Sequence, residues 1–260
     1  MEAGLDHVKR AYEEWGSEDP FHAVLTKKSK RKGGWDVQEF FRTGEREIEE
    51  VMGRVEALGL DPASGPAGGR ALDFGSGVGR LSQALAGRFA RVLGVDISSS
   101  MVEKARELNR HGERVRYLVN ARDDLALLED GSFDFVYSSI TLQHVPPRFV
   151  RRYIREFFRV LVPGGVAVFQ MRSGPRIRPG SLRERLYRLN REHLRRLLQR
   201  LRRKPAYEIH FLARSEIEEL IAASGGRLLD VLDVSGPGRS GKSYRYCAMA
   251  GPGGPAPGQR

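Results

Sequence analysis

The stretch that decides the fold runs from Ala71 to Ser98 and reads ALDFGSGVGRLSQALAGRFARVLGVDIS. A short apolar run leads into a glycine-rich turn, a helical stretch follows, and a second apolar run ends at the carboxylate Asp96. Glycines at the end of a strand let the backbone approach a ligand closely, and the next helix offers its N-terminus to the same place. The pattern therefore predicts a strand–turn–helix unit beside a nucleotide-like ligand.

The spacing of the glycines narrows the choice of ligand. A dinucleotide-binding turn has the spacing G-x-G-x-x-G, whereas Gly75, Gly77 and Gly79 give G-x-G-x-G. Asp73 precedes the turn, and a carboxylate there disfavours a pyrophosphate and favours a cationic ligand. S-adenosylmethionine carries a sulfonium and an ammonium group. Asp96 lies 21 residues after Gly75, where an acid can accept hydrogen bonds from both ribose hydroxyls. The turn therefore predicts S-adenosylmethionine as the ligand.

Strand-like and helical runs alternate from Arg70 onward, which predicts a parallel sheet with helices on both faces. The expected strands are 70–74, 91–96, 115–119, 133–139 and 165–171, and the expected helices lie near 79–89, 98–110 and 148–161. Residues 227–234 and 243–250 form two further runs, separated by a glycine-rich stretch, and predict a closing antiparallel pair.

The order of these motifs resembles that of the class I S-adenosylmethionine-dependent methyltransferases, over about residues 70–250. LDFGSGVGR resembles the family's first motif and VLGVDIS its ribose-binding motif, while VNARDDLALLEDGSFDFVYSSITLQHV and EFFRVLVPGGVAVF resemble the segments that follow. The resemblance implies a Rossmann-like seven-stranded sheet in the order 3-2-1-4-5-7-6, with strand 7 antiparallel.

The same resemblance assigns site residues. It places Asp73, Gly75 and Gly77 at the methionine portion of the cofactor, Asp96 at the ribose and Ile97 against the adenine. The adenine edge is expected to meet the loop of residues 120–124, within which Asp123 is favoured over Asp124. The full expected cofactor set is Asp73, Gly75, Gly77, Asp96, Ile97, Arg122, Asp123 and Ser138.

Two histidines are candidates for catalysis. His144 follows the fourth expected strand, at the edge of the sheet toward which the donor methyl group would point. It is either a general base or acceptor-orienting group, or a histidine that only hydrogen-bonds its own loop. His210 is a second candidate. Because the methyl donor is already activated, positioning does most of the work, and a base is needed only where the acceptor must lose a proton.

Absent motifs bear on the acceptor. The fourth-strand motif SSITLQH lacks the Asn/Asp-Pro-Pro-Tyr/Phe of enzymes that methylate exocyclic base amines, and it lacks the cysteine of cytosine C5 chemistry. It also lacks the carboxylate cluster of a metal-dependent catechol-type site, so no metal is expected. These absences favour an oxygen or nitrogen of a small molecule, with an anionic, sugar-containing or secondary metabolite as the acceptor.

The positive charge of the chain is concentrated in one segment. Residues 171–206 hold 13 basic and two acidic residues, so this segment carries the whole net charge of +11. A leucine stripe over 181–203 predicts an arginine-covered amphipathic helix that packs on the enzyme and roofs the acceptor pocket. An anionic membrane surface and RNA are the alternatives. An RNA or protein methyltransferase and a non-catalytic S-adenosylmethionine-binding protein therefore remain alternative functions.

Three regions follow along the chain. Residues 1–69 are expected to form a helical cap and linker, in which Trp15, Trp35, Phe40 and Phe41 either cover the donor pocket or pack the first helix. Residues 70–250 are the expected methyltransferase core, with the basic insertion at about 172–206, and 251–260 the expected disordered tail. The single cysteine and the absence of an apolar leader or span predict a cytoplasmic protein. The sequence does not determine the oligomeric state.

Overall fold

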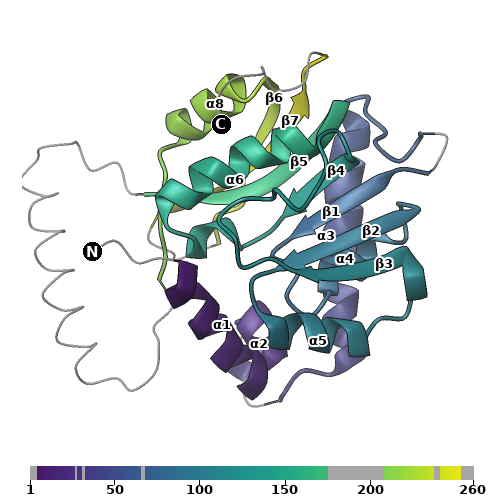
Figure 1. The fold of residues 1–260 in the computed structure, drawn as a ribbon, viewed down its shortest axis with the longest axis vertical. Helices are drawn as coiled ribbons and strands as arrows, with labels where there is room; N and C mark the ends of the chain where they lie inside the picture. Colours follow the sequence, from purple (N-terminus) through teal and green to yellow (C-terminus); the bar gives the residue numbers. More distant parts are fainter. Residues whose placement is uncertain are drawn as a thin grey trace, which may run out of the picture.

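The fold is built around one seven-stranded sheet, in which the strands lie in the order β3-β2-β1-β4-β5-β7-β6 (Figure 1). The computed structural model describes residues 5–26, 28–30, 33–65, 68–174, 208–236 and 241–252. Strand β7 runs antiparallel to both of its neighbours, and the pairs from β3 to β5 are parallel. The fold class predicted from the sequence is confirmed. The strands are β1 (Arg70–Phe74), β2 (Arg91–Asp96), β3 (Val115–Val119), β4 (Phe133–Ser138), β5 (Leu161–Ser173), β6 (Gly226–Asp233) and β7 (Lys242–Ala250).

Helices cover both faces of the sheet, and a hydrophobic cluster lies between each face and its helices. Buried side chains of α6 and α8 belong to one cluster, and the other contains buried side chains of α4, the second half of α3 and part of α5. Figure 1 shows α6 and α8 in front of the sheet and α3 and α4 behind it. The helices are α1 (Leu5–Glu18), α2 (Pro20–Val24), α3 (Val37–Ala57), α4 (Arg80–Leu85), α5 (Ser99–Glu107), α6 (Pro147–Val160) and α8 (Arg214–Ala223).

The central position of β1 in the sheet explains why its sequence, RALDF, is mostly apolar. All of β1 after its first residue is buried, because helices cover both of its faces. Its register with β2 pairs Asp73 with Gly94 and Phe74 with Val95. The carboxyl ends of β1 and β2 therefore meet at one edge, and the glycine turn lies at that edge.

Several expected boundaries differ from the structure, and the two largest differences are at the end of α4 and at the start of β5. The helix expected at 79–89 ends at Leu85, because the amides of Gly87 and Arg88 bond to carbonyls only three residues back and tighten the last turn. Strand β5 begins at Leu161 rather than at residue 165. It contains Pro163 and Gly164, and its pairing with β4 is irregular there.

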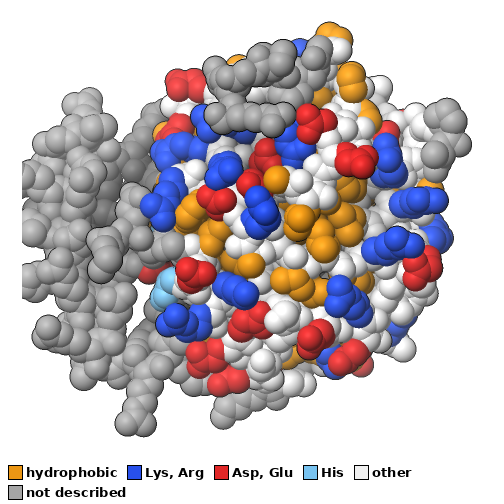
Figure 2. All heavy atoms as spheres, viewed as in Figure 1, with side chains coloured by type: hydrophobic (Ala, Val, Ile, Leu, Met, Phe, Trp, Pro, Cys, Tyr) orange, Lys and Arg blue, Asp and Glu red, His pale blue; other side chains and the backbone are white. Residues whose placement is uncertain are grey.

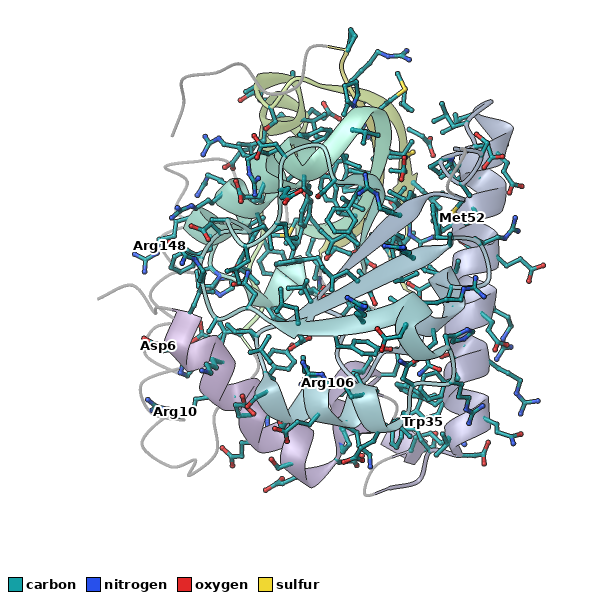
Figure 3. All side chains as sticks on the ribbon, turned by 45° about the vertical axis from the view of Figure 1, so that its right-hand side comes forward. Asp6, Arg10, Trp35, Met52, Arg106 and Arg148 are labelled. Atoms are coloured by element: carbon teal, nitrogen blue, oxygen red, sulfur yellow. The ribbon has the colours of Figure 1, made fainter. Side chains whose placement is uncertain are left out.

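The N-terminal region is helical and packs on the sheet domain. Trp35, Phe40 and Phe41 are buried in a third cluster that includes Val78 of the glycine turn. Figure 3 labels Trp35 just before α3 and Met52 on that helix. The aromatic side chains thus pack α3 onto the sheet domain, and Trp35 also lines the central cavity.

The basic insertion and the tail lie outside the described residues, except for 172–174 and 251–252. On the described face that Figure 2 displays, basic and acidic side chains are interspersed. None of the helices in the described part of the chain combines the length and the apolar composition of a membrane span.

Candidate functional site

A large cavity opens at the carboxyl ends of the parallel strands. Its volume is about 1180 Å³, compared with roughly 300–1,000 Å³ for typical small-molecule sites. The glycine turn, Asp96 and Ile97 line one part, which we call the donor end. Residues of α3, β5 and β7 line another part, which we call the acceptor end. The volume is sufficient for two small molecules side by side.

The glycine turn fits closely between its neighbours. Gly75 has φ +79°, and a Cβ placed on it would lie 2.1 Å from the Thr141 Oγ1. A Cβ on Gly77 would lie 2.7 Å from a methyl group of Val24 in α2. Both glycines line the cavity. Larger side chains would therefore displace the loop after β4 or the N-terminal cover.

Asp96 is held at the floor of the donor end by backbone donors. Its Oδ2 accepts the amide of Gly77 at 2.8 Å, and its Oδ1 accepts the amide of Ser98 at 2.9 Å. Burial raises the pKa of Asp96, while these donors oppose the rise. Each carboxylate oxygen has a further lone pair with which to accept a hydroxyl proton. Ile97 lines the cavity beside it.

Asp73 lies beneath the turn and is fully buried. Its Oδ2 accepts the Ser82 hydroxyl at 2.6 Å, and its Oδ1 has no hydrogen-bond partner among the described residues. Burial raises the pKa of Asp73 to about 7, against the Ser82 hydrogen bond and the charge of Arg80. An incompletely satisfied carboxylate under the turn adds negative potential at the donor end without lining the cavity.

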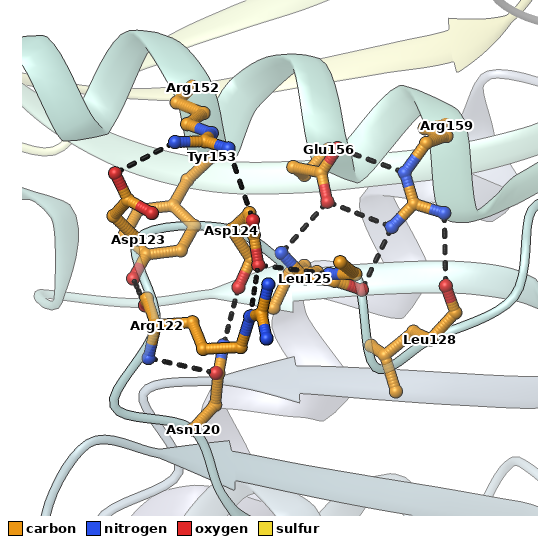
Figure 4. A network of polar contacts seen from close by, with 11 residues as sticks. Asn120, Arg122, Asp123, Asp124, Leu125, Leu128, Arg152, Tyr153, Glu156 and Arg159 are labelled. Atoms are coloured by element: carbon orange, nitrogen blue, oxygen red, sulfur yellow. Dashed lines mark hydrogen bonds and ion pairs between the residues drawn. The ribbon is translucent and has the colours of Figure 1, made fainter. Parts of the chain in front are cut away.

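The loop after β3 contributes a different residue from those expected. Asn120 is buried and lines the cavity, whereas Arg122 is exposed, Asp123 is half-buried, and neither lines the cavity. The Arg122 side chain pairs with Asp124 at 3.0 Å, and Asp123 pairs with Arg152 of α6 at 2.8 Å (Figure 4). The backbone of Arg122 is also engaged, by the Asn120 Oδ1 and by the hydroxyl of Tyr153. These contacts with α6 hold the loop in place and leave Asn120 toward the cavity.

Ser138 is also outside the cavity lining. Its hydroxyl donates to the Phe74 carbonyl at 3.0 Å, and this bond ties the end of β4 to β1. The next three residues, Ser139, Ile140 and Thr141, line the cavity instead. Ile140 has φ +65°, an uncommon conformation for a β-branched residue, so the backbone reverses sharply there. No sequence signal marks this turn.

His144 lines the cavity at the short 3-10 turn Leu142–His144. Its Nδ1 lies 2.9 Å from the Glu208 carbonyl oxygen, which can only accept, so Nδ1 carries the proton. Nε2 is then the acceptor, 3.1 Å from the Gln143 side-chain nitrogen. Burial lowers the pKa of His144 to about 4, with further lowering by His210 and Arg172. The imidazole is therefore neutral near pH 7.

His210 lies behind His144 and does not line the cavity. Its backbone amide donates to the Gln143 carbonyl at 2.7 Å, and its Nε2 lies 3.5 Å from a Glu208 carboxylate oxygen. These contacts place His210 in the wall that supports the 3-10 turn. The sequence-predicted pair therefore separates into one cavity residue and one supporting residue.

Glu47 of α3 is a cavity residue that the sequence did not single out. It accepts the hydroxyls of Tyr137 at 2.8 Å and Ser139 at 2.6 Å, and it pairs with Arg80 at 2.7 Å. Burial raises the pKa of Glu47, but the Arg80 charge and these donors outweigh it and leave the pKa below its usual value. The sequence signal that could have identified Glu47 is its position beside Ile48, where a carboxylate lies on the apolar face of a helix.

The N-terminal helices close the donor end. Leu5, Val8 and Tyr12 of α1 line the cavity with Val24 of α2. Glu13 fastens α1 to the start of α5, where its carboxylate accepts the amides of Ser99 and Ser100 at 2.6 and 3.0 Å. Burial opposes ionisation of Glu13, yet these donors lower its pKa to about 2. The cover is thus held by an ionised carboxylate at a helix N-terminus.

No group of three or more histidine, cysteine or acidic side chains in the described residues is arranged to hold a metal ion.

The fold is the one that class I methyltransferases share, and residues 72–169 match the family model described as a methyltransferase domain. This match covers 98 of the 260 residues and includes the glycine turn, Asp96 and the 3-10 turn of His144.

Relatives by sequence include two proteins named ubiquinone biosynthesis O-methyltransferase. The one from Xanthomonas axonopodis pv. citri (strain 306) is 40% identical over 119 residues, which cover 45% of each chain. The one from Thiobacillus denitrificans (strain ATCC 25259 / T1) is 36% identical over 112 residues, which cover 42% of this chain and 47% of the relative. The match thus spans about half the length of these relatives.

Solved structures share the fold at low identity. Magnesium protoporphyrin IX methyltransferase from Synechocystis PCC 6803, solved with bound SAH, has a TM-score of 0.61 and 19% identity, covering 95% of this chain and 100% of its own. The cyclase SpnF has a TM-score of 0.64 and 17% identity, covering 96% of this chain and 98% of its own. Because a cyclase shares the architecture, the reaction has to be argued from the cavity.

Proposed function

We propose that the protein transfers a methyl group from S-adenosylmethionine to an oxygen of a small-molecule acceptor. The observation that carries this proposal is that one cavity holds both Asp96, at the floor of the glycine turn, and the neutral imidazole of His144. The two O-methyltransferase relatives support oxygen as the acceptor atom.

The donor end has the chemistry that the cofactor requires. The turn at Gly75 and Gly77 packs so closely that a Cβ at either position would collide with Thr141 or Val24, and Asp96 offers two carboxylate oxygens to ribose hydroxyls. Asp73 supplies negative potential with its unpartnered buried oxygen, which favours a cationic group above it. When bound, S-adenosylmethionine supplies a methyl group on an activated sulfonium. Among the expected cofactor residues, Arg122, Asp123 and Ser138 act in our proposal through support of the loop and the sheet edge.

His144 is suited to remove the acceptor proton. The Glu208 carbonyl fixes its tautomer with Nε2 as the acceptor, so a hydroxyl of the methyl acceptor can take the place of Gln143 at Nε2. A base with a pKa of about 4 is weak toward a free hydroxyl. It is strong enough for an oxygen that has begun to bond the methyl group, because that oxygen becomes a far stronger acid. His144 therefore takes the proton late in the transfer.

Two measurements test this function on the full chain. Calorimetry should detect binding of S-adenosylmethionine and S-adenosylhomocysteine, and no binding of NAD. Incubation with methyl-labelled donor and a panel of hydroxylated small molecules should then yield an ether product, identified by mass spectrometry. Donor binding without transfer to any acceptor would favour a binding protein, and labelled RNA or protein would favour those acceptor classes. A labelled amine would move the acceptor atom to nitrogen.

A further inference from the structure

We propose that the acceptor end of the cavity binds an anionic group, a carboxylate or a phosphate, on the methyl acceptor. The surface that would bind it consists of Gln170 and Arg172 of β5, Arg245 of β7 and Arg46 of α3, and we call it the basic wall. This inference rests on the proposed function, because it assigns the acceptor to the same cavity.

The pattern along β5 is the first support. Val166 and Val168 pack in the core against α3, so by strand alternation Gln170 and Arg172 fall on this same face. If the core continued along this face of β5, residues 170 and 172 would be apolar as well. Gln170 and Arg172 are instead half-buried polar side chains that line the cavity, so this face of β5 changes from apolar to polar where the cavity begins.

Strand β7 also changes from apolar to polar side chains, at the position opposite Gln170. Cys247 lies in the α3-side core, and Arg245, two residues earlier, pairs in register with Gln170. Ser243 lies opposite Arg172 in the strand register, and its hydroxyl accepts a hydrogen bond from the side-chain amide of Gln170 at 2.8 Å. Two adjacent strands thus switch from apolar to polar together where the cavity begins.

The charges of the acceptor end are unequal. Three guanidinium groups whose contacts are described, Arg46, Arg80 and Arg245, line the cavity there together with the carboxylates of Glu47 and Glu50. Arg80 pairs with Glu47 at 2.7 Å, and Arg245 contacts Glu50 at 3.2 Å. Arg46 is exposed and has no carboxylate partner within the described part of the chain. The surplus is positive, and guanidinium groups bind carboxylate and phosphate through paired hydrogen bonds.

The basic wall is also linked to His144. The charge of Arg172 contributes to the low pKa of His144. An anion on Arg172 would offset this charge and make the imidazole a better base at the moment the acceptor is in place. Acceptors with an anionic group would therefore both bind better and react faster than their neutral analogues.

Calorimetric titration of the full chain, saturated with S-adenosylhomocysteine, tests the inference. The probes are 3,4-dihydroxybenzoate and its neutral analogue 4-methylcatechol, with phenyl phosphate to distinguish phosphate from carboxylate. We expect at least one anionic probe to bind 10-fold or more tightly than 4-methylcatechol. Arg245→Gln and, separately, the exposed Arg46→Gln should each reduce this preference at least threefold. Arg116→Gln, at an exposed position on β3, is the matched control and should leave the preference unchanged.

The outcomes separate this inference from the proposed function. If the charged and neutral probes bind equally, or if neither binds while S-adenosylhomocysteine binds normally, the inference of anion binding at the basic wall is wrong and the proposed function stands. A preference that survives both arginine substitutions would overturn it as well. Failure of S-adenosylhomocysteine to bind the unmodified chain would instead remove the proposed function on which the inference depends.

Discussion

The donor end and the acceptor end of the cavity differ in how far apart their residues lie in the sequence. Gly75, Gly77, Asp96 and Ile97 come from one strand–turn–helix–strand unit within 23 consecutive residues. The basic wall brings together Arg46, Gln170 and Arg245, which are separated by most of the chain. A site built from neighbouring residues is visible as a motif, whereas one built by the sheet order becomes visible only in the folded protein.

A second difference is the state of the charged groups. At the donor end the carboxylate that lines the cavity, Asp96, is held by the backbone amides of Gly77 and Ser98. At the acceptor end charged side chains hold one another, as Arg80 and Glu47 do. Backbone donors fix a site rigidly, while side-chain pairs can be exchanged between proteins of one fold without altering the strands. The comparison leads us to expect a constant donor and a variable acceptor across this fold.

The substitution with the largest expected effect is Gly75→Ala, which would break the donor end alone. Its Cβ would lie 2.1 Å from the Thr141 Oγ1 at a φ of +79°, so the turn must move. We expect donor affinity to fall by about 100-fold or more, or about 2.7 kcal/mol. Gly53→Ala in α3 is the control, because a Cβ there meets nothing within 4 Å and should stabilise the fold by about 0.5–1 kcal/mol. Calorimetry and thermal unfolding report both, and normal affinity of Gly75→Ala would contradict the placement of the donor.

His144→Gln should separate chemistry from donor binding. Loss of the Nε2 lone pair removes the proton acceptor, and we expect kcat to fall by about 100-fold with little change in the donor Kd. His7→Gln, at a more exposed histidine 3.9 Å from Glu208, serves as the control. Single-turnover assays at saturating donor measure the difference. An unchanged kcat would leave His144 with the purely structural role of holding its loop.

Asp96→Ala should weaken the donor end without affecting acceptor binding. It removes the acceptor for two ribose hydroxyls and leaves the amides of Gly77 and Ser98 unpaired. We expect a loss of about 1–3 kcal/mol in donor affinity, or about 5–150-fold. Glu103→Ala on the exposed side of α5 is the control. Should the two variants bind the donor equally well, Asp96 would not be a donor ligand.

The smallest expected effect is a proton release that only the donor end should produce. Asp73 has a pKa of about 7, and a cation bound above it favours the ionised form. Donor binding should release about 0.5 proton at pH 7 and about 0.9 at pH 6, seen by calorimetry in buffers with different ionisation enthalpies. Asp73→Asn should abolish the release. Equal release by this variant would assign the proton to another group.

The same group predicts a pH dependence of stability in the free protein. The pKa of Asp73 is higher in the folded state than its usual value of 3.8, so the folded state holds more protons between about pH 4 and 7. The contribution of Asp73 to stability is therefore lost as the pH rises through this range. His144 has the opposite sign, because its lowered pKa makes the unfolded state hold more protons between about pH 4 and 6.5.

The sequence by itself determined the sheet and the donor end. Alternating strand and helix runs predicted a parallel sheet with helices on both faces, whereas the strand order came from the resemblance to the methyltransferase family. The turn at Gly75 and Gly77 and the acid at Asp96 were found because local backbone geometry requires those residue types at that spacing. His144 was found as a candidate because it closely follows β4, at the edge where parallel strands end.

Only the tertiary structure decided which neighbouring side chain faces the cavity. Arg122 and Asp123 are adjacent to Asn120 in the loop, yet contacts with Arg152 and Tyr153 turn them outward and leave Asn120 inward. The basic wall likewise exists because β7 inserts beside β5 in antiparallel register and brings Arg245 to Gln170. Such placements depend on pairing energies between distant segments, and these energies are summed over the whole fold rather than contained in a local stretch of sequence.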